Sequence, residues 1–386
     1  MKGYFRKRGS LWSFTVDIGR KTDGSRNQKT KSGFRTKREA EQACAELITQ
    51  LTKGDYLEPS KKTVQEAMEA WLSTILQSTL RISTYDNYSK AILKRIIPAL
   101  GKLKLKDVQP DHIQSFYLDL VKEGLSSEYI RYLHSILKSF FKYQVRLRNI
   151  TKNVVDLAIP PRIGRKEQKT WSIKEAVRFL EVAKEDNQSY YIVYLIALYT
   201  GLRRGEILSL RWKDCDLNQG KISVCQTLYY SNQQFHFLEP KTSRSNRLVS
   251  IPDTVVEILK SYRLEQEKYK GEVGSAYEDY DLIAANELGR PINPRSLTGH
   301  FRRTIKKANV PKIRFHDTRH THATILLKIG EHVKIVSERL GHSNAAMTMN
   351  VYSHVTSDMQ IEAAKKFETA LKVSSNNLEG TDAKTK

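Results

Sequence analysis

The segment AIPPRIGRKEQKT, residues 158–170, divides this chain into parts that need separate cores. It contains two adjacent prolines, followed by charged residues that show no apolar periodicity. Proline cannot continue a helix, because it lacks the backbone N–H and its ring clashes with the preceding turn. We therefore expect an extended linker at 158–170 between independently folded regions.

Residues 62–157 carry the pattern of a helical domain. Thr63 and Glu66 predict a capping box at its start, and an apolar stripe with helical spacing follows. Further helices are expected over residues 83–97, 110–122 and 127–147. The stripe consists of Val64, Ala67, Met68, Trp71, Leu72 and Ile75. Such stripes are typical of a packed core, so the sequence predicts a four-helix unit.

Residues 1–56 show strand patterns before a single helix. The stretch SLWSFTVDIG alternates apolar and polar residues, and KTDGSRNQKTKSGF supplies an Asp-Gly turn and a second strand. The stretch TKREAEQACAELITQL predicts a helix, with Thr36 as N-cap and Glu39 completing a capping box. We expect a small sheet backed by one helix.

Residues 171–372 are predicted to be mostly helical. Ser172 and Glu175 cap the first helix, and YYIVYLIALYTG reads as a buried helix ended by Gly201. Strand patterns occur only in GKISVCQTLYY, FHFLEP and NRLVSIP, which predict one small antiparallel sheet on a helical body. The polar residues 373–386 are expected to form a disordered tail.

The charge of the chain points to a polyanionic partner. Lys and Arg number 65 against 42 acidic residues, and residues 1–38 hold 12 of these bases against Asp17 and Asp23 alone. Nucleic acid is the expected partner, and a merely solvated basic surface is the alternative. The sequence contains no run of about 18 apolar residues, so no transmembrane helix is expected. Three cysteines without ligand-like spacing and no signal peptide favour the cytoplasm of a bacterial cell.

The stretch HDTRHTHAT, residues 316–324, raises the question of a metal site. On a helix His316, Arg319 and His320 share one face, while His322 points elsewhere. Two histidines four residues apart are typical zinc ligands, but a permanent cation beside them opposes metal binding. Arginine matches phosphate oxygens with a planar fork of donors, and histidine exchanges protons near neutral pH. We therefore expect phosphate chemistry, with neither a metal nor a cofactor.

Other segments supply more residues suited to phosphate. Arg203 and Glu206 lie in TGLRRGE, and Lys241 lies in PKT, in a hairpin-like position between two strand patterns. His342 follows in LGHS, and Tyr352 lies ten residues later in NVYSHV. In this order, and together with the HDTRH stretch, these segments resemble the tyrosine recombinase (phage integrase) family.

The resemblance implies a role for each of these residues. Tyr352 is the nucleophile, and Glu206 has a supporting role. The implied catalytic residues are Arg203, Lys241, His316, Arg319, His342 and Tyr352. It also implies a multidomain, mainly α protein, in which residues 62–157 form a helical, SAM-like core-binding domain and residues 171–372 the catalytic domain. Residues 1–56 resemble the three-stranded arm-binding domain of phage and conjugative-transposon integrases.

The function implied is site-specific recombination that integrates or excises a mobile element or prophage through a 3′-phosphotyrosyl intermediate. The implied partners are double-stranded DNA at core and arm sites, three further copies in a homotetramer, a host bending factor and an excisionase. A type IB topoisomerase and a non-catalytic DNA-binding regulator are the alternatives. The stretch SDMQIEAAKKFETALKV predicts an amphipathic helix that packs on its own domain or docks on a neighbouring protomer.

Overall fold

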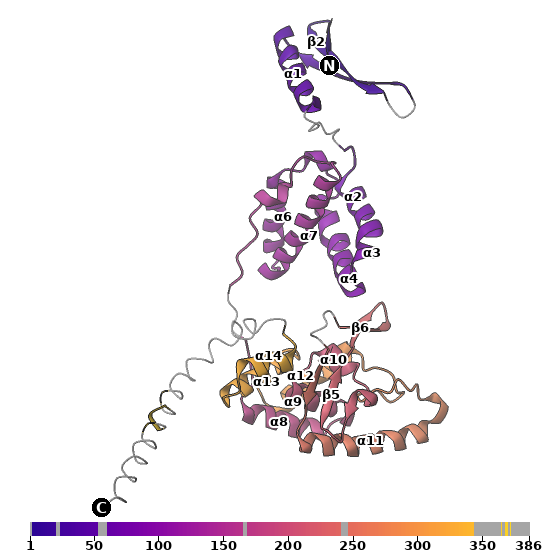
Figure 1. Ribbon diagram of the computed structural model, residues 1–386, viewed down its shortest axis with the longest axis vertical. Coiled ribbons are helices and arrows are strands. Elements are labelled where there is room, and N and C mark those ends of the chain that lie inside the picture. Colours follow the sequence, from indigo (N-terminus) through magenta and orange to yellow (C-terminus); the bar gives the residue numbers. More distant parts are fainter. Residues whose placement is uncertain are drawn as a thin grey trace, which may run out of the picture. The chain divides into compact units, whose positions relative to one another are not determined.

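The computed structural model describes residues 2–20, 24–52, 60–164, 168–240 and 246–342, together with Ala364, Phe367, Glu368, Thr369 and Leu371. Residues 1–164 and 165–386 form two compact units (Figure 1). Each unit is described by itself below. No helix among the described residues is both long and apolar enough to cross a membrane.

The first described region is an antiparallel sheet covered on one face by a helix. The strands run in the order β1 (Gly3–Arg8), β2 (Leu11–Arg20) and β3 (Arg26–Phe34), and α1 (Lys37–Thr52) follows. Phe14 and Val16 of β2 are fully buried in a small core with residues of α1. The expected three-stranded sheet and helix are confirmed.

The cap of α1 differs in one bond from the expected box. The Glu39 N–H donates to Thr36 Oγ1 at 3.2 Å, as expected. The Glu39 carboxylate, however, accepts from the Arg35 N–H at 2.9 Å rather than from Thr36. The hydrogen bond from the Glu39 carboxylate therefore goes to Arg35, one residue before Thr36, and holds the backbone that precedes α1.

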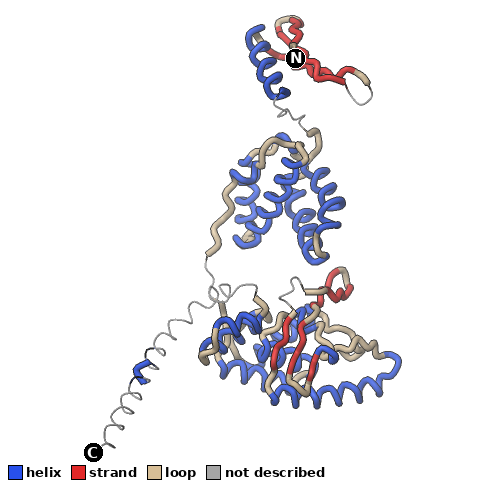
Figure 2. Tube along the Cα trace, in the orientation of Figure 1, coloured by secondary structure: helices blue, strands red, loops and turns tan. Residues whose placement is uncertain are grey.

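Residues 60–164 form an all-helical region around its own apolar core (Figure 2). The capping box of Thr63 with Glu66 is confirmed. The elements are α2 (Val64–Trp71), η1 (Leu72–Leu76), α3 (Gln77–Thr79), α4 (Ile82–Ala91), η2 (Ile92–Ile96), α5 (Ile97–Leu100), η3 (Leu105–Asp107), α6 (Pro110–Lys122), α7 (Ser127–Arg146) and η4 (Val154–Leu157).

The helix expected over residues 83–97 runs further than its sequence indicated. It begins at Ile82 and continues through Pro98 to Leu100. A proline in a helix removes one hydrogen bond and crowds the carbonyl four residues earlier. The π-helical turn η2, in which the Ile97 N–H donates to the Ile92 carbonyl, lies just before Pro98 and widens the helix there.

The described part of the expected linker has no helix or strand, yet its start is fixed to the helical region. The side-chain amide of Gln114 on α6 donates to the Ile159 carbonyl at 3.3 Å and accepts from the Ile159 N–H at 3.0 Å. Arg131 on α7 donates to the Pro161 carbonyl at 3.3 Å.

The second unit is a helical body with two small sheets. The buried helix α9 packs against α8, α10 and α13, and the capping box of Ser172 with Glu175 starts α8. The helices are α8 (Ile173–Lys184), α9 (Gln188–Thr200), α10 (Arg204–Leu208), η5 (Trp212–Asp214), α11 (Asp253–Val273), η7 (Gly274–Ala276), α12 (Pro294–Ala308), α13 (Asp317–Lys328) and α14 (Val333–Leu340).

The strands of this unit correct the expectation of a single sheet. β4 (Cys215–Asp216), β5 (Lys221–Val224) and β8 (Arg247–Ser250) form one antiparallel sheet. β6 (Thr227–Ser231) and β7 (Gln234–Leu238) form a separate hairpin. Asn232 and Gln233 turn this hairpin with positive φ angles of 46° and 63°, as a two-residue turn of the mirror-image type requires. GKISVCQTLYY is therefore two strands of different sheets.

Candidate active site

A left-handed glycine at the end of α9 places the first candidate arginine. Gly201 has φ 66° and ψ 18°, and a Cβ there would lie 2.7 Å from atoms of both His322 and Leu340. Only glycine adopts this conformation in so little space. The chain turns, buries Leu202 and begins α10 with Arg203 as its N-cap.

Glu206 holds Arg203 from the first turn of α10. Its carboxylate accepts from Arg203 Nη1 at 2.8 Å and from the Arg203 backbone N–H at 2.9 Å. It also pairs with Arg247 Nη2 of β8 at 2.9 Å. Burial alone would raise the pKa of Glu206, but the hydrogen bonds and charges of Arg247 and Arg203 hold it below its ordinary value. The carboxylate is therefore ionised at neutral pH.

The start of α13 supplies the second arginine and two histidines. His316 is the N-cap residue, and Arg319 in the first turn is only 3% exposed. Arg319 Nη1 donates to the Gly201 carbonyl at 2.9 Å, and Nη2 donates to the Leu340 carbonyl at 2.6 Å. The rings of His316 and His320 meet edge to face, with centroids 5.2 Å apart. The expected proximity of His316 and His320 is therefore observed.

At the end of α14, three successive backbone carbonyls each accept a hydrogen bond from a different arginine. Arg247 Nε donates to Arg339 at 2.7 Å, Arg319 to Leu340, and Arg203 Nη2 to Gly341 at 3.5 Å. Carbonyls at a helix C-terminus lack partners within the helix and carry partial negative charge, so guanidinium groups stabilise them. Gly341 ends the helix in the left-handed conformation, and His342 follows it.

The histidines of this cluster are held neutral. Burial, followed by the charges of Arg319 and Arg203, lowers the pKa of His342 to about 4. Burial and the neighbouring His316 lower that of His320 to about 4, and burial with Arg319 lowers the pKa of His316. At neutral pH each imidazole therefore has one donor and one acceptor nitrogen.

The structure brings together five of the residues proposed from sequence: Arg203, Glu206, His316, Arg319 and His342. Lys241 and Tyr352 lie outside the described residues. The strands that flank Lys241, β7 and β8, pair with β6 and β5 rather than with each other. These two strands therefore belong to different sheets.

His322, which was not proposed as a catalytic residue, packs against the end of α9. It is 6% exposed, and its Nδ1 is 2.8 Å from the Leu198 carbonyl. Burial lowers its pKa to about 4, so it packs as a neutral side chain between α13 and α9.

Sequence reasoning missed Arg247 and Arg339. Arg339 donates to the carbonyls of Tyr199 and Ser250 at 3.3 and 3.1 Å, and so ties α14 to α9 and β8. In the sequence both residues look like ordinary basic side chains of a strand and a helix. Their partners come from distant segments: Arg247 binds the Glu206 carboxylate and the Arg339 carbonyl, and Arg339 binds two carbonyls of other elements. No local signal could have identified them.

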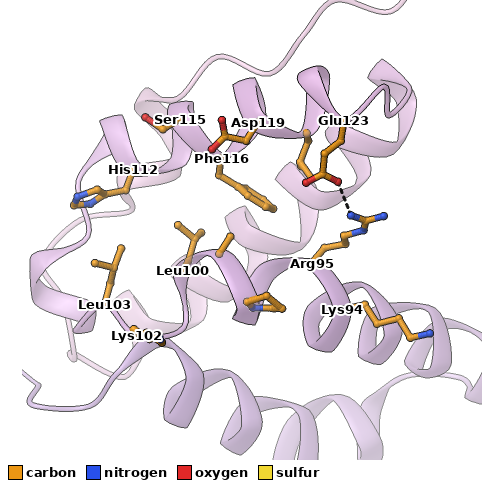
Figure 3. A pocket seen from close by; sticks show the side chains of 13 residues that line it. Lys94, Arg95, Leu100, Lys102, Leu103, His112, Ser115, Phe116, Asp119 and Glu123 are labelled. Carbon is orange, nitrogen blue, oxygen red and sulfur yellow. Dashed lines mark hydrogen bonds and ion pairs between the residues drawn. The ribbon is translucent and has the colours of Figure 1, made fainter.

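Among the described residues, no group of three or more His, Cys, Asp or Glu side chains is placed to hold a metal ion. A separate hollow of about 590 Å³ lies in the helical region (Figure 3). Its rim mixes Lys94 and Lys102 with Asp119, and Arg95 is paired with Glu123 at 2.7 Å. None of the candidate residues lines it.

Three protein-family descriptions match successive parts of the chain. An arm DNA-binding domain matches residues 4–51, and the N-terminal SAM-like domain of phage integrases matches residues 63–121. The phage integrase family itself matches residues 170–359.

Curated relatives cover between 74% and 94% of this chain in the two comparisons that follow. A XerC-like tyrosine recombinase of Caldanaerobacter subterraneus subsp. tengcongensis is 30% identical over 381 residues, which cover 94% of this chain and 97% of that protein. The ICEBs1 integrase of Bacillus subtilis is 29% identical over 287 residues, 74% of this chain and 78% of that integrase.

Solved structures share the fold. The Tn1549 transposon integrase in complex with transposon right end DNA has a TM-score of 0.66 at 22% identity, covering 79% of this chain and 99% of that one. A λ integrase dimer bound to a core site has a TM-score of 0.57 at 18% identity, covering 90% and 93%. The expected multidomain, mainly helical fold is confirmed.

These likenesses define the class of the protein: it is a tyrosine recombinase, an enzyme that breaks and rejoins DNA strands. The chain belongs to the phage integrase family. The family resemblance noted in the sequence is thereby confirmed.

Proposed function

We propose that the protein recombines double-stranded DNA at specific sites to integrate and excise a mobile element or prophage in the bacterial cytoplasm, with Tyr352 as nucleophile. The observation that carries the proposal is the convergence of Arg203 and Arg319 on one helix end, beside neutral His316 and His342. Two fixed cations next to neutral imidazoles suit a phosphodiester.

Strand cleavage follows from these groups. Arg203 and Arg319 stabilise the scissile phosphate and the added charge of its pentavalent transition state. The Tyr352 oxygen attacks phosphorus while neutral His316 accepts the phenolic proton. The bond from phosphorus to the 5′ oxygen breaks, Lys241 protonates that oxygen, and His342 donates a hydrogen bond to the phosphate. The products are a 3′-phosphotyrosyl link and a 5′-hydroxyl.

Rejoining reverses these steps with a hydroxyl from a partner duplex. The phosphotyrosyl link keeps the energy of the phosphodiester, so neither ATP nor a metal ion is required. Exchange between two duplexes needs four protomers, and we propose a homotetramer assembled on DNA. Segment 357–373, which the sequence predicts to be an amphipathic helix, lies largely outside the described residues.

We further propose a division of labour among domains. Residues 1–56 bind arm sites, 62–157 bind the core site, 158–170 link them to catalytic residues 171–372, and 373–386 form a tail. A host bending factor and an excisionase would act at the arm sites.

The open face of the N-terminal sheet supports an arm-binding role. Tyr4, Thr15 and Thr30 are directly paired across the sheet, on the face opposite the one that Phe14 buries against α1. Tyr4 is 70% exposed, and Arg6 lies two residues along the same strand. A short sheet of this kind can enter the major groove, where base edges are distinguishable.

A suicide substrate tests the catalytic proposal. Duplex DNA is nicked beside the crossover site mapped from the ends of the element that carries the gene, so that the cleaved fragment diffuses away. We expect an SDS-resistant protein–DNA adduct, and strand exchange when a second attachment site is added. A DNA-binding regulator would form no adduct, and a type IB topoisomerase would form an adduct and relax supercoils without exchange.

A truncated protein tests the division of labour. A fragment of residues 62–386 retains all proposed catalytic residues and should still form the adduct at the crossover site. It should lose integration between full attachment sites, because the arm contacts that assemble the complex are missing. If the full-length protein and the 62–386 fragment integrated equally well and gave identical footprints, residues 1–56 would have no role in binding arm sites.

A further inference from the structure

Arg247 is a buried arginine that joins two parts of the candidate site. It starts β8, and its side chain is only 7% exposed. Its Nη2 and Nη1 lie 2.9 and 3.4 Å from the two carboxylate oxygens of Glu206, while its Nε donates to the Arg339 carbonyl at 2.7 Å. One guanidinium therefore binds both α10 and the end of α14.

The Glu206 carboxylate is shared between two arginines. Oε1 accepts from Arg203 Nη1 at 2.8 Å, and Oε2 accepts from the Arg203 backbone N–H and from Arg247. Because Arg247 binds the same two oxygens that accept from Arg203, it limits the directions in which Glu206 can turn. The position of the Arg203 guanidinium depends on that orientation.

The contact with α14 has the same consequence. A Cβ on Gly341 would lie 3.1 Å from both Cδ and Nη1 of Arg247, so the arginine already lies against this glycine. The carbonyls on either side of this contact, those of Leu340 and Gly341, accept from Arg319 and Arg203. A shift of the α14 end would move both arginines.

We propose that Arg247 is a positioning residue for strand cleavage: by holding Glu206 and the last turn of α14 together, it sets Arg203 and Arg319 at the spacing the transition state needs. The inference rests on the proposed function. Arg247 acts through Arg203 and Arg319, because it binds Glu206 and the end of α14, which these two arginines also contact. A fixed geometry of this kind accelerates the step without adding affinity for DNA.

The test compares Arg247→Met with a matched control in the same unit. Arg211 pairs with Asp214 through Nε at 2.7 Å and Nη2 at 2.9 Å, and Asp214 is also largely buried. Arg211→Met therefore breaks a similar ion pair. Among the described residues, no hydrogen bond of Arg211 joins it to a residue of the candidate active site. Melting temperature, DNA affinity and the single-turnover rate of adduct formation are measured for the wild type and both variants.

We expect Arg247→Met to slow adduct formation about a hundredfold, as a displacement of about 1 Å does, while its affinity for the core site stays within about threefold. Arg211→Met should melt earlier than the wild type but cleave at the wild-type rate. Cleavage by Arg247→Met at the control's rate would overturn the inference, as would an equal loss in both variants. A wild-type protein that forms no adduct would instead overturn the proposed function.

The pH dependence separates positioning from a general structural role. Without Arg247, burial should raise the pKa of Glu206. Below that pKa the neutral carboxyl releases Arg203, and above it the carboxylate holds Arg203. Cleavage by Arg247→Met should therefore fall, relative to the wild type, as pH drops from about 8 to about 5.5. In the Glu206→Gln/Arg247→Met double variant this extra fall should be absent, and its persistence would contradict the inference.

Should the methionine variant fail to fold, Arg247→Lys replaces it. A single ammonium cannot reproduce the planar contacts to both Glu206 and Arg339, so cleavage should drop at least about tenfold. A lysine variant that cleaves at the wild-type rate would overturn the proposal.

Discussion

The N-terminal sheet and the second unit, residues 165–386, both carry positively charged side chains, but the exposure of these side chains is opposite. On the strands of the sheet Arg6, Lys7 and Arg8 are exposed to solvent. In the second unit Arg319 and Arg247 are almost completely buried, with each guanidinium bonded to defined acceptors. Exposed charges attract DNA through their summed field, so one of them can substitute for another. Buried charges act as hydrogen-bond donors at fixed positions. Substitutions in the two regions should therefore differ sharply in size.

The largest effect is expected where neither set of charges changes. Tyr352→Phe removes only the hydroxyl proposed to attack phosphorus, so DNA binding should stay near normal while the covalent adduct disappears. Gel-shift titration and an SDS gel of the suicide reaction measure the two properties. A persistent adduct would move the nucleophile to another residue.

The buried arginines come next. Arg203→Ala and Arg319→Ala should each slow cleavage by at least about a hundredfold, because a donor aimed at the transition state is lost. Arg204→Ala is the matched control: its side chain is exposed and reaches Thr298 of α12 at 3.3 Å. Single-turnover rates measure all three variants, and a larger loss from Arg204 would show that the wrong arginine had been assigned.

A single exposed charge should matter far less. Arg6→Ala should weaken binding to arm-site DNA modestly and reduce the slope of log affinity against log salt by about 0.9, the effect of one phosphate contact. Cleavage of a core-site suicide substrate should be unchanged. Titrations at several salt concentrations measure the slope. A hundredfold loss of arm binding with an unchanged slope would mean that Arg6 reads a base instead.

Removal of metal ions is expected to have no effect on recombination. Excess EDTA should leave recombination unchanged, because arginine and lysine take the place that a divalent cation holds in many nucleases. The measurement is strand exchange with and without the chelator. Strict loss of activity, restored by Mg²⁺ or Zn²⁺, would favour the metal interpretation of His316 and His320.

Much of the fold could be predicted because its signals are local. The capping boxes at Thr63 and Ser172, the buried helix before Gly201 and the helix over residues 110–122 depend on a few neighbouring residues. The π-helical turn before Pro98 could not be predicted, because proline usually ends a helix. In the structure Ile92, Ile96 and Leu100, on both sides of this proline, are buried in the core of the helical region. The two-sheet arrangement was missed because strand pairing is decided between distant segments.

The candidate site divides along the same line. Arg203, His316, Arg319 and His342 lie in short motifs whose order is visible in the sequence, and the structure brings them together. Sequence reasoning assigned Glu206 a supporting role without identifying its partners, which in the structure are Arg203 and Arg247. Arg247 is recognisable only from the burial of its side chain and from the Arg339 carbonyl, which lies 92 positions along the chain.

The arginine contacts at the end of α14 also bear on when the enzyme becomes active. The bond from Arg319 reaches a carbonyl 118 positions earlier, and the bond from Arg203 reaches one 138 positions later. Contacts over such separations form late in folding, because a long loop must close first. The ribosome releases Arg203 well before Gly341, and domains fold from the N-terminus during synthesis. A nascent or prematurely terminated chain should therefore complete its N-terminal sheet and helical region before the candidate active site can form.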